Sequence, residues 1–559
     1  MNLALIFKNN AMETRSAKKR RLHNNLINIK SETNITGEDR ITHLPDAVLY
    51  DIFNRLPAPL IETIVRMSIL SKKWRNVWYN FPDLDFTKFV TFPEDSNAKI
   101  LYLKNLGNAI NQILSSRNNN SEVRLLRFYA SMSFSALNSV IRNAVRLRVQ
   151  ELDMRVETTY NDAFNFPRSI IRNDCLRVLK IKSLYGFRLL PDKIISSGFK
   201  NLETLSFSDV HLGIYSSLTD MFTDSTFPKL RKLYLAQCCD MVHLRVACPL
   251  LEELVMENCR WLQGLEILSP KLETLRVSNC FRAIDYMDKC WLKIDTPTLR
   301  SFVWVNTAIP GKSCWSNLDC LADVTLGLLV SRETLGADRL ESASSFLTAL
   351  SNAVSLTLEQ SLVELNSLEV HPSRFSCLAN VLKVCPMVHT LTIKINNLNN
   401  PPRKFNRPLV QALSYFEQEN YWESQIEGLS PLLKYLKFVT IQGVTEYHGM
   451  SLAKFTLKYG TVLQDFIIYP GEEDWNTQHE RIKSSIMKFS RASIDAKITF
   501  HESLLDPKEP AFSEDQLFIC GRHMHLRESK TDHMTVAEEQ GRKFLGLWFQ
   551  FTTFHTYAH

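Results

Sequence analysis

Hydrophobic residues recur along most of the chain in a short fixed pattern. One apolar residue is followed by two variable residues, a second apolar residue, one variable residue and a third apolar residue. The clearest copies are Val123-Leu126-Phe128, Val149-Leu152-Met154, Leu176-Leu179-Ile181, Leu202-Leu205-Phe207, Leu230-Leu233-Leu235, Leu251-Leu254-Met256, Leu272-Leu275-Val277 and Leu299-Phe302-Trp304. The alternation within each copy predicts a short strand with one buried face.

Weaker copies continue the pattern toward the C-terminus. They are Leu321-Val324-Leu326, Ala353-Leu356-Leu358, Leu365-Leu368-Val370, Val388-Leu391-Ile393, Leu436-Val439-Ile441 and Leu463-Phe466-Ile468. Leu356 and Leu368 are only 12 residues apart (368 − 356). That spacing is too short for a full repeat and indicates a missing piece or a misassigned strand.

The spacing between copies identifies the kind of repeat. The central residues of the clear copies follow one another at intervals of 26, 27, 26, 28, 21, 21 and 27 residues, within the range of about 20–29 residues that is typical of leucine-rich repeats. A unit of this size buries its leucines only by stacking on its neighbours. The pattern therefore predicts an α/β repeat fold, a curved solenoid with a parallel sheet on its concave face.

The variable residues of each copy are expected to point outward from that sheet. In the three clearest repeats they form a row of mixed charged and aromatic character, which suits a protein-binding face: Arg231, Lys232, Tyr234, Glu252, Glu253, Val255, Glu273 and Arg276. For any single member, a solvated position on the sheet is the simpler interpretation.

A different pattern occupies residues 44–79. Leu44-Pro45-Asp46 suits a helix start, because proline in the first turn loses no hydrogen bond and Asp46 faces the positive end of the helix dipole. Apolar residues then recur at helical spacing to Leu56, Pro57 ends the helix, and two further helical segments follow. Three short helices close only a small core, so they either need a partner or begin a larger domain.

Residues 39–86 resemble an F-box of the plant form that precedes leucine-rich repeats. The matching residues are Asp39-Arg40-Ile41, Leu44-Pro45-Asp46, Leu49, Ile52, Leu56-Pro57, Val65-Arg66, Ser68 to Arg75, Trp78 and Pro82 to Phe86. The segment 58–64 is about three residues longer than in the family pattern. The resemblance implies docking to a Skp-type adaptor, and through it to a cullin, by Leu44, Pro45, Leu49, Ile52, Phe53, Leu56, Ile69, Leu70 and Trp74. Some of these residues must instead hold the three helices together.

The resemblance to plant F-box/leucine-rich-repeat proteins extends to about residue 503. It includes the segment 248–254, and residues 457–500 resemble the FBD segment that often closes such chains. The expected organisation is a disordered basic arm over 1–38, the F-box over 39–86, repeats over 120–445, an FBD-like segment and solenoid cap over 446–503, and a tail of unknown structure over 504–559.

Charge and composition limit the classes of partner that the chain is expected to bind. The chain of 559 residues carries a net charge of +7, and its first 40 residues hold eight Lys/Arg and four acidic residues. The rest is nearly balanced, which argues against binding nucleic acid. No apolar run reaches the roughly 18 residues that span a membrane. Lys18-Lys19-Arg20-Arg21 is either an import signal or a solvated basic run, so we expect the nucleus, the cytoplasm or both.

Candidate chemical sites are few. Cys238, Cys259 and Cys280 lie 21 residues apart, each at the turn where a leucine-rich repeat carries a small buried Asn or Cys, so we expect packing rather than a metal site. Cys520 with His523 and His525 lacks a second pair of ligands. Glycine is scarce, and neither a phosphate-binding loop nor a hydrolase motif occurs. We expect no cofactor, no metal and no enzymatic activity.

The hypothesis that joins these features is the substrate-recognition subunit of an SCF (Skp-cullin-F-box) ubiquitin ligase. The F-box would bind the adaptor, and the repeats would bind a target protein for ubiquitination. One alternative is an interaction scaffold that forms no ligase. Another is a small-molecule-dependent F-box receptor, which would need several basic residues converging on the solenoid, and the scattered Lys229, Arg231, Lys232 and Arg245 do not establish this.

Overall fold

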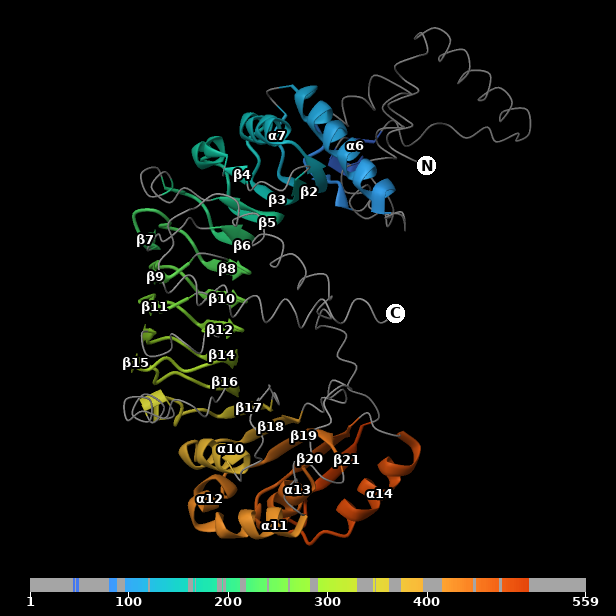
Figure 1. Ribbon diagram of the computed structural model, residues 1–559, viewed down its shortest axis with the longest axis vertical. Helices are drawn as coiled ribbons and strands as arrows, with labels where there is room; N and C mark the ends of the chain where they lie inside the picture. The colour runs from blue at the N-terminus through green and yellow to red at the C-terminus, as the bar shows by residue number, and fades with distance from the viewer. Residues whose placement is uncertain are drawn as a thin grey trace, which may run out of the picture. The chain divides into compact units, whose positions relative to one another are not determined.

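The computed structural model describes the chain in segments between residues 44 and 501. They are 44–45, 47–49, 80–87, 96–118, 121–158, 164–165, 167–188, 194, 198–211, 218–238, 241–259, 262–281, 290–328, 345–346, 348–360, 373–395, 415–445, 449–471 and 475–501. One long parallel sheet runs through nearly all of these segments (Figure 1).

This 16-stranded sheet follows the order of the chain. Its strands in spatial order are β1 (Asp83–Asp85), β2 (Leu125–Met132), β3 (Glu151–Thr158), β5 (Val178–Arg188), β6 (Thr204–His211), β8 (Lys232–Ala236), β10 (Glu253–Glu257), β12 (Thr274–Ser278), β14 (Ser301–Thr307), β16 (Asp323–Leu328), β17 (Ser355–Gln360), β18 (Thr390–Ile395), β19 (Phe438–Val444), β20 (Asp465–Pro470) and β21 (Lys497–Phe500). The short β4 (Phe164–Asn165) pairs with β5 beside this path. The α/β repeat fold expected from the hydrophobic pattern is confirmed.

The register aligns the apolar residues of successive repeats. Leu254 of β10 stands opposite Leu233 of β8 and Leu275 of β12, and all three side chains are fully buried. Residues on either side of each leucine are exposed or half-buried. Because side chains alternate across a strand, each repeat adds one leucine to a continuous buried row, and the stack forms the core.

A left-handed residue lies at or near the end of each central strand, within β6 and β14 and directly after β8, β10 and β12. Positive φ angles occur four residues after the central apolar residue in five successive repeats, at Asp209, Gln237, Asn258, Asn279 and Asn306. Short polar side chains tolerate this conformation better than most residues. Asn258 and Asn279 each precede one of the cysteines noted in the sequence, so the Asn-Cys pairs mark the point where each repeat leaves the sheet.

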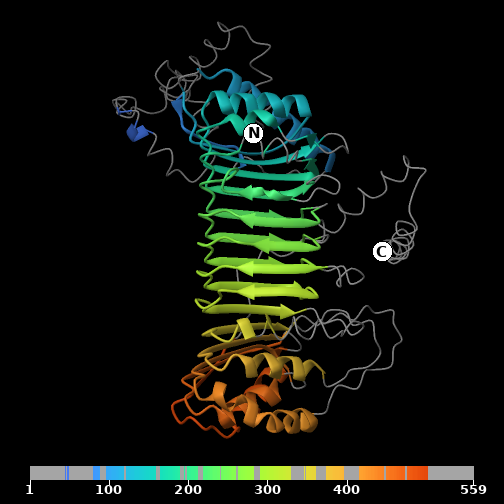
Figure 2. The same ribbon diagram turned by 90° about the vertical axis from the view of Figure 1, so that its left-hand side faces the viewer.

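A second parallel sheet, which the hydrophobic pattern did not predict, lies on the other side of the core. It has five strands, in the order β15 (Lys312–Ser316), β13 (Trp291–Asp295), β11 (Gly264–Ile267), β9 (His243–Ala247) and β7 (Leu218–Thr223). Figure 2 shows its strands stacked one above another, and Figure 1 shows β8 to β16 beside them. The return segments of these repeats are therefore strands, with Leu265 and Ile267 pointing into the core.

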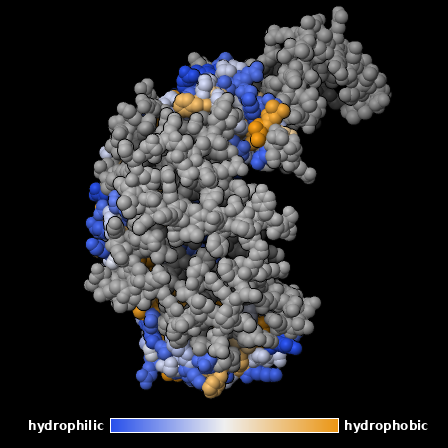
Figure 3. All heavy atoms as spheres, in the orientation of Figure 1, coloured by the Kyte–Doolittle hydropathy of each residue, from blue (hydrophilic) through white to orange (hydrophobic). Residues whose placement is uncertain are grey.

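Helices replace the second sheet at both ends of the stack. The N-terminal end carries α6 (Ser96–Ser115), α7 (Phe134–Arg146) and the 3-10 helix η2 (Arg168–Arg172), and the C-terminal end carries α10 (Ser373–Val384), α11 (Tyr415–Ser424), α12 (Ile426–Leu433), α13 (Met450–Tyr459) and α14 (Trp475–Met487). Hydrophobic side chains reach the surface over α6 and over the lowest helices in Figure 3. Two of them are Ile100 and Leu101 of α6.

The strand pairing corrects one expected repeat. β17 pairs directly with β18, with Leu356 opposite Leu391, so Leu365-Leu368-Val370 supplies no strand between them. That segment lies outside the described residues. The mistake arose because three apolar residues at the right spacing occur by chance in a long connection, and the 12-residue interval signalled it.

The two ends of the sheet come from segments outside the range 120–445 expected for the repeats, although Leu463-Phe466-Ile468, which runs into β20, is one of the weaker copies of the pattern. β1 belongs to the closing residues of the F-box-like region and pairs with β2, with Leu84 opposite Leu126. β20 and β21 belong to the FBD-like region and continue the same parallel ladder from β19. The basic arm 1–38, most of the F-box-like region and the tail 504–559 lie outside the described residues.

Candidate protein-binding face

The eight residues proposed to contact a target lie together on three neighbouring strands and at the positions immediately before them. Lys232, Glu253 and Thr274 are aligned across β8, β10 and β12, and Tyr234, Val255 and Arg276 form the next aligned row. Arg231, Glu252 and Glu273 lie immediately before the strands. The side chains of all these residues are exposed or half-buried, and we call this surface the central face.

Most charges of the central face pair with one another. Arg231 Nη2 lies 2.6 Å from Glu252 Oε1, and Lys232 Nζ lies 3.0 Å from Glu253 Oε2. Arg276 Nε lies 3.5 Å from an oxygen of Glu257 on β10. Exposed pairs of this kind contribute at most about 1 kcal/mol each. They leave the face without a dominant charge, so electrostatics alone does not specify its partner.

The middle of the central face is aromatic and aliphatic. The Tyr234 hydroxyl donates a hydrogen bond of 2.8 Å to Glu253 Oε2. Partial burial, this hydrogen bond and the charge of Glu253 raise the pKa of Tyr234 to about 12, so the phenol is neutral at physiological pH. With Val255 beside it, Tyr234 offers a fixed ring within a polar rim, which is the usual anatomy of a protein-binding surface.

The three stacked cysteines have a packing role. Cys238, Cys259 and Cys280 are all buried. Their Sγ atoms lie 3.8, 3.6 and 3.8 Å from the carbonyl oxygens of Phe207, Leu235 and Met256, each in the preceding repeat. Burial raises the pKa of the Cys280 thiol, which keeps it protonated. Among the described residues, no group of three or more His, Cys, Asp or Glu is arranged to hold a metal ion.

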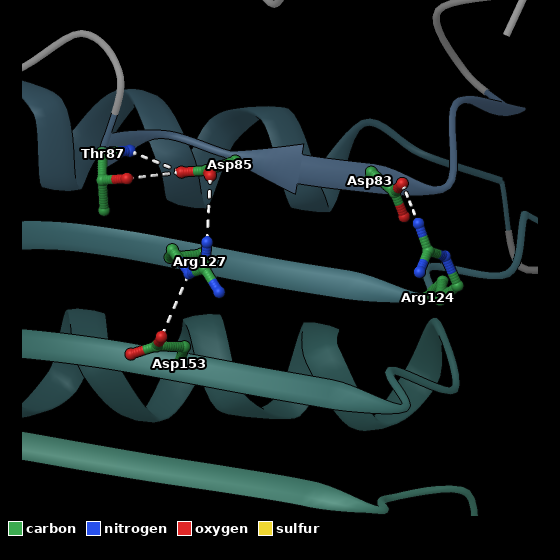
Figure 4. A network of polar contacts seen from close by, with 6 residues as sticks. All are labelled: Asp83, Asp85, Thr87, Arg124, Arg127 and Asp153. Atoms are coloured by element: carbon green, nitrogen blue, oxygen red, sulfur yellow. Dashed lines mark hydrogen bonds and ion pairs between the residues drawn. The ribbon is translucent and has the colours of Figure 1, made fainter. Parts of the chain in front are cut away.

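A polar network joins β1 to the first repeats (Figure 4). Arg127 of β2 lies between two carboxylates, with Nε 3.0 Å from Asp153 Oδ2 and Nη1 3.3 Å from Asp85 Oδ2. Partial burial opposes its charged form, but the charges of Asp153 and Asp85 prevail and raise the pKa of Arg127. The Thr87 hydroxyl donates to Asp85 Oδ1 over 2.6 Å, so Asp85 is held from both sides.

Backbone contacts strengthen the same junction. The Phe86 N–H donates to the Arg127 carbonyl over 2.8 Å. Arg117, which is 3% exposed, donates from Nη1 to the Phe81 carbonyl over 2.9 Å. Leu84 is fully buried. Residues 81–86 are therefore part of the solenoid's first layer.

Three of the nine predicted adaptor contacts fall on described residues. Pro45 is exposed, Leu44 is half-buried against the core, and Leu49 is fully buried. The Val48 and Leu49 N–H groups donate to the Pro45 carbonyl over 3.0 and 3.1 Å, which forms the first helical turn expected at Pro45. Ile52, Phe53, Leu56, Ile69, Leu70 and Trp74 lie outside the described residues.

Burial begins to divide the predicted contacts. Leu49 belongs to the protein's own core, whereas Pro45 is accessible to a partner. Val48, which the prediction omitted from the contact set, is 41% exposed. Helical spacing alone does not separate Val48 from Leu49, because adjacent residues at the border of an apolar stripe differ by only 100° of rotation.

Comparison with known proteins decides the family. A family model of the F-box domain matches residues 41–85, and a model described as the At1g61320/AtMIF1 LRR domain matches residues 118–311. The Arabidopsis thaliana F-box/FBD/LRR-repeat protein At4g03220 is 34% identical over 520 residues, which cover 88% of this chain and all of that protein. The chain belongs to the F-box/FBD/LRR-repeat family.

Other family members match shorter regions. The Arabidopsis thaliana F-box/LRR-repeat protein At5g02930 is 28% identical over 38% of this chain and 40% of its own length. The F-box/FBD/LRR-repeat protein At2g04230 is 44% identical over 57 residues, which are 10% of this chain and 12% of that protein. The resemblance drawn from the sequence is thus confirmed.

Family membership implies a role of the substrate-receptor type for this F-box/FBD/LRR-repeat protein. F-box/LRR proteins are typically non-catalytic adaptors. Within the described part of the chain, no helix is both long and apolar enough to cross a membrane. The target contacts on the central face and the individual adaptor contacts remain predictions.

Proposed function

We propose that this protein is the substrate-recognition subunit of an SCF ubiquitin ligase. The F-box docks on a Skp-type adaptor, which links it to a cullin. The repeats bind a target protein and present it for ubiquitination. The chain itself supplies no catalytic group, and its contribution is proximity: it raises the effective concentration of target lysines at the ubiquitin-conjugating enzyme.

The observation that carries this proposal is the continuity of β1 with the repeats. A receptor subunit works by holding two partners at a fixed separation. Leu84 and the Asp85–Arg127–Asp153 network tie the end of the F-box into the same sheet that carries the central face. A flexible linker would instead spread the target over many positions and lower its effective concentration.

The central face is the proposed target-binding surface. Tyr234 and Val255 would supply the apolar contact, while the ion pairs around them form its rim. Those ion pairs are already formed within the face. A target that displaces them would therefore gain little binding free energy from its charges alone. Affinity would then depend on the fit of an apolar side chain beside Tyr234.

The small-molecule receptor alternative gains no support from the four basic residues that could have favoured it. Arg231 and Lys232 pair with Glu252 and Glu253. Arg245 lies 3.2 Å from Glu266, and Lys229 Nζ donates to the Asn201 side chain over 2.7 Å. All four are engaged within the fold, and Arg245 lies on the second sheet, so they do not converge on one anion.

The test is binding of the full chain to a purified Skp-type adaptor. The full chain is needed because β1 completes its pairing only with β2. Pro45→Ala combined with Val48→Asp should abolish adaptor binding and leave the melting temperature unchanged, because both side chains are exposed. Val354→Asp is a matched control, since Val354 is 44% exposed but lies far along the sheet. A folded wild-type chain that does not bind would refute the ligase role and leave the scaffold alternative.

The cellular site follows from the same proposal. We place the protein in the nucleus, the cytoplasm or both, on the strength of the basic run Lys18-Lys19-Arg20-Arg21. A fluorescent fusion with all four residues changed to alanine would lose nuclear accumulation if the run is an import signal.

A further inference from the structure

One position of the repeat changes character along the solenoid. The position lies four residues before the second apolar residue of each copy of the repeat, in the loop that leads into the strand. From β2 to β17 this position is mainly polar, as at Glu122, Arg148, Lys229 and Lys271, and Leu250 is its one aliphatic residue. From β18 to β21 it is apolar in every repeat.

The four residues of this last part are Met387, Tyr435, Val462 and Ile494. They are 43%, 43%, 38% and 97% exposed. A large apolar side chain that is almost fully exposed is unusual, and four at equivalent positions of successive repeats form an apolar surface rather than isolated exposed residues. We call this set the apolar column.

Backbone hydrogen bonds hold the column together. Two residues after each column position, the ladder between repeats begins: the Lys437 N–H donates to the His389 carbonyl over 2.9 Å, and the Gln464 N–H donates to the Lys437 carbonyl over 2.8 Å. The rings of His389 and Tyr435 meet edge to face with centroids 6.1 Å apart. Successive column residues therefore follow the spacing of parallel strands, about 4.8 Å.

Phe438 extends the column toward the sheet. It is 38% exposed, and it stands between Thr390 of β18 and Asp465 of β20. The residues aligned with Phe438 in the two neighbouring strands, Thr390 and Asp465, are both polar. The apolar surface thus broadens next to Tyr435.

The surroundings of the column are basic. Residues 434–438, 461–465 and 488–497 include five basic residues, Lys434, Lys437, Lys488, Arg491 and Lys497, against the two acidic residues Asp465 and Asp495. Within the described part of the chain, no ion pair neutralises Lys434, Lys437 or Lys497, and Lys497 of β21 stands opposite Asp465 of β20. This contrasts with the central face, where neighbouring charges are paired.

We propose that the apolar column binds an amphipathic helix with acidic flanks, carried by the target protein. The apolar stripe of the helix would cover Met387, Tyr435, Val462 and Ile494, and its carboxylates would meet the lysines. The identity of the partner as a ubiquitination target rests on the proposed function; the chemistry of the partner does not.

The spacing favours a helix over an extended strand. A helix presents an apolar residue once per turn of about 5.4 Å, close to the strand spacing of about 4.8 Å, so one turn matches one repeat. An extended chain repeats each face about every 6.7 Å and falls out of step after two repeats. The four column residues are separated by three intervals, so a helix of about three turns, about 16 Å long, covers them.

The experiment measures binding of two labelled 18-residue helical peptides to the full chain by fluorescence polarisation. Both carry leucines along one stripe; one has glutamates on its flanks and the other has lysines. The glutamate peptide should bind saturably, and the lysine peptide at least about tenfold more weakly. Combining Val462→Asp with Ile494→Asp should lower the affinity for the glutamate peptide at least about tenfold, because the new carboxylates would lie beneath the apolar stripe of the bound helix.

Two further variants sharpen the test. Lys271→Asp with Cys320→Asp places aspartates at exposed positions of the same repeat register outside the column, and should leave peptide binding unchanged. Lys434→Glu with Lys437→Glu should reverse the preference between the two peptides. Circular dichroism must show that every variant is folded, which the exposure of the changed residues favours.

The opposite results would overturn the proposal. These are no binding of the glutamate peptide, equal binding of both peptides, or unaltered binding by the Val462/Ile494 variant. Binding of the chain to phosphatidylserine vesicles that the same variant abolishes would assign the column to a membrane surface instead. A dimer in sedimentation that the variant dissociates would assign it to self-association. Adaptor binding is measured separately. A chain that binds the adaptor but not the glutamate peptide contradicts this proposal and leaves the ligase role intact.

Discussion

Leu84→Ala tests whether the end of the F-box is part of the solenoid. The Leu84 side chain is fully buried in β1 and stands opposite Leu126. Truncation of a buried leucine to alanine costs about 2–5 kcal/mol, depending on how far the cavity collapses. Within the described residues, β1 has a partner strand on one side, so the cavity left by Leu84→Ala can partly collapse. We therefore expect a loss of about 3 kcal/mol in stability, in the lower half of that range.

This loss should appear locally. A repeat contacts mainly its neighbours, so the weakened layer opens while the rest of the stack stays closed. At about 1.4 kcal/mol for each factor of ten, a loss of about 3 kcal/mol raises the frequency of opening about 100-fold. Hydrogen-exchange mass spectrometry of the full chain should therefore show much faster exchange of the Phe86, Arg124 and Leu125 N–H groups, which all bond across the β1–β2 junction.

Leu463→Ala is the matched control for this measurement. Leu463 is 1% exposed and lies just before β20, at the other end of the sheet. Its truncation should accelerate exchange around β20 and leave the β1–β2 peptides unchanged. Unchanged exchange in Leu84→Ala would refute the continuity of the F-box end with the repeats. Faster exchange along the whole sheet would refute the local character of the opening.

Three other predictions concern stability, titration and reactivity. Gly443→Ala should lower the free energy of unfolding by about 2–3 kcal/mol in denaturant titration, because Gly443 has a φ of +75° and its Cβ would lie 2.0 Å from the Ile395 carbonyl oxygen. Gly428→Ala should cost much less, because its Cβ would meet only the flexible end of the Lys383 side chain, 2.7 Å away, and alanine favours the helix. Because the pKa of Tyr234 is raised to about 12 from about 10, its stabilising contribution is complete below pH 10 and is lost as the pH rises through about 12. Glu253→Gln should move its absorbance titration to lower pH, and an unmoved curve would contradict the assigned hydrogen bond. Alkylation of the native chain, read by peptide mass spectrometry, should reach exposed thiols and spare buried ones until denaturant is added. Among the described residues, Cys314 and Cys320 are exposed, and Cys238, Cys248, Cys259, Cys280, Cys290 and Cys385 are buried.

The period of the leucines made the main sheet predictable. Leu233, Leu254 and Leu275 recur at the interval of one repeat, and a strand that buries one face must place them in one row. The F-box was recognisable for a different reason: a dense set of residues in fixed order, from Leu44-Pro45-Asp46 to Trp78, needs no knowledge of long-range contacts.

The second sheet was missed although its signal is present. The segments His243–Ala247 and Gly264–Ile267 alternate apolar and polar residues as the main strands do, and stand at the same 21-residue interval (264 − 243). They are short and follow closely on the stronger copies, so the hydrophobic pattern of the main strands did not include them. A search for a second repeating strand within each unit would have found them.

Contacts between repeats were beyond prediction because they depend on register. Arg231 and Glu252 are 21 residues apart in the sequence, and only the pairing of β8 with β10 brings them together. The junction of Asp85 with Arg127 likewise requires β1 to pair with β2. The apolar column became visible once the register showed that Met387, Tyr435, Val462 and Ile494 occupy one position of the repeat.

The most direct test of the central claim is the assembly of the purified full chain with a Skp-type adaptor and the adaptor-binding domain of a cullin, followed by light scattering after gel filtration. The account predicts one complex with a mass of one copy of each protein, and its loss when Pro45→Ala and Val48→Asp are combined. A folded chain that elutes apart from an intact adaptor–cullin pair would contradict it.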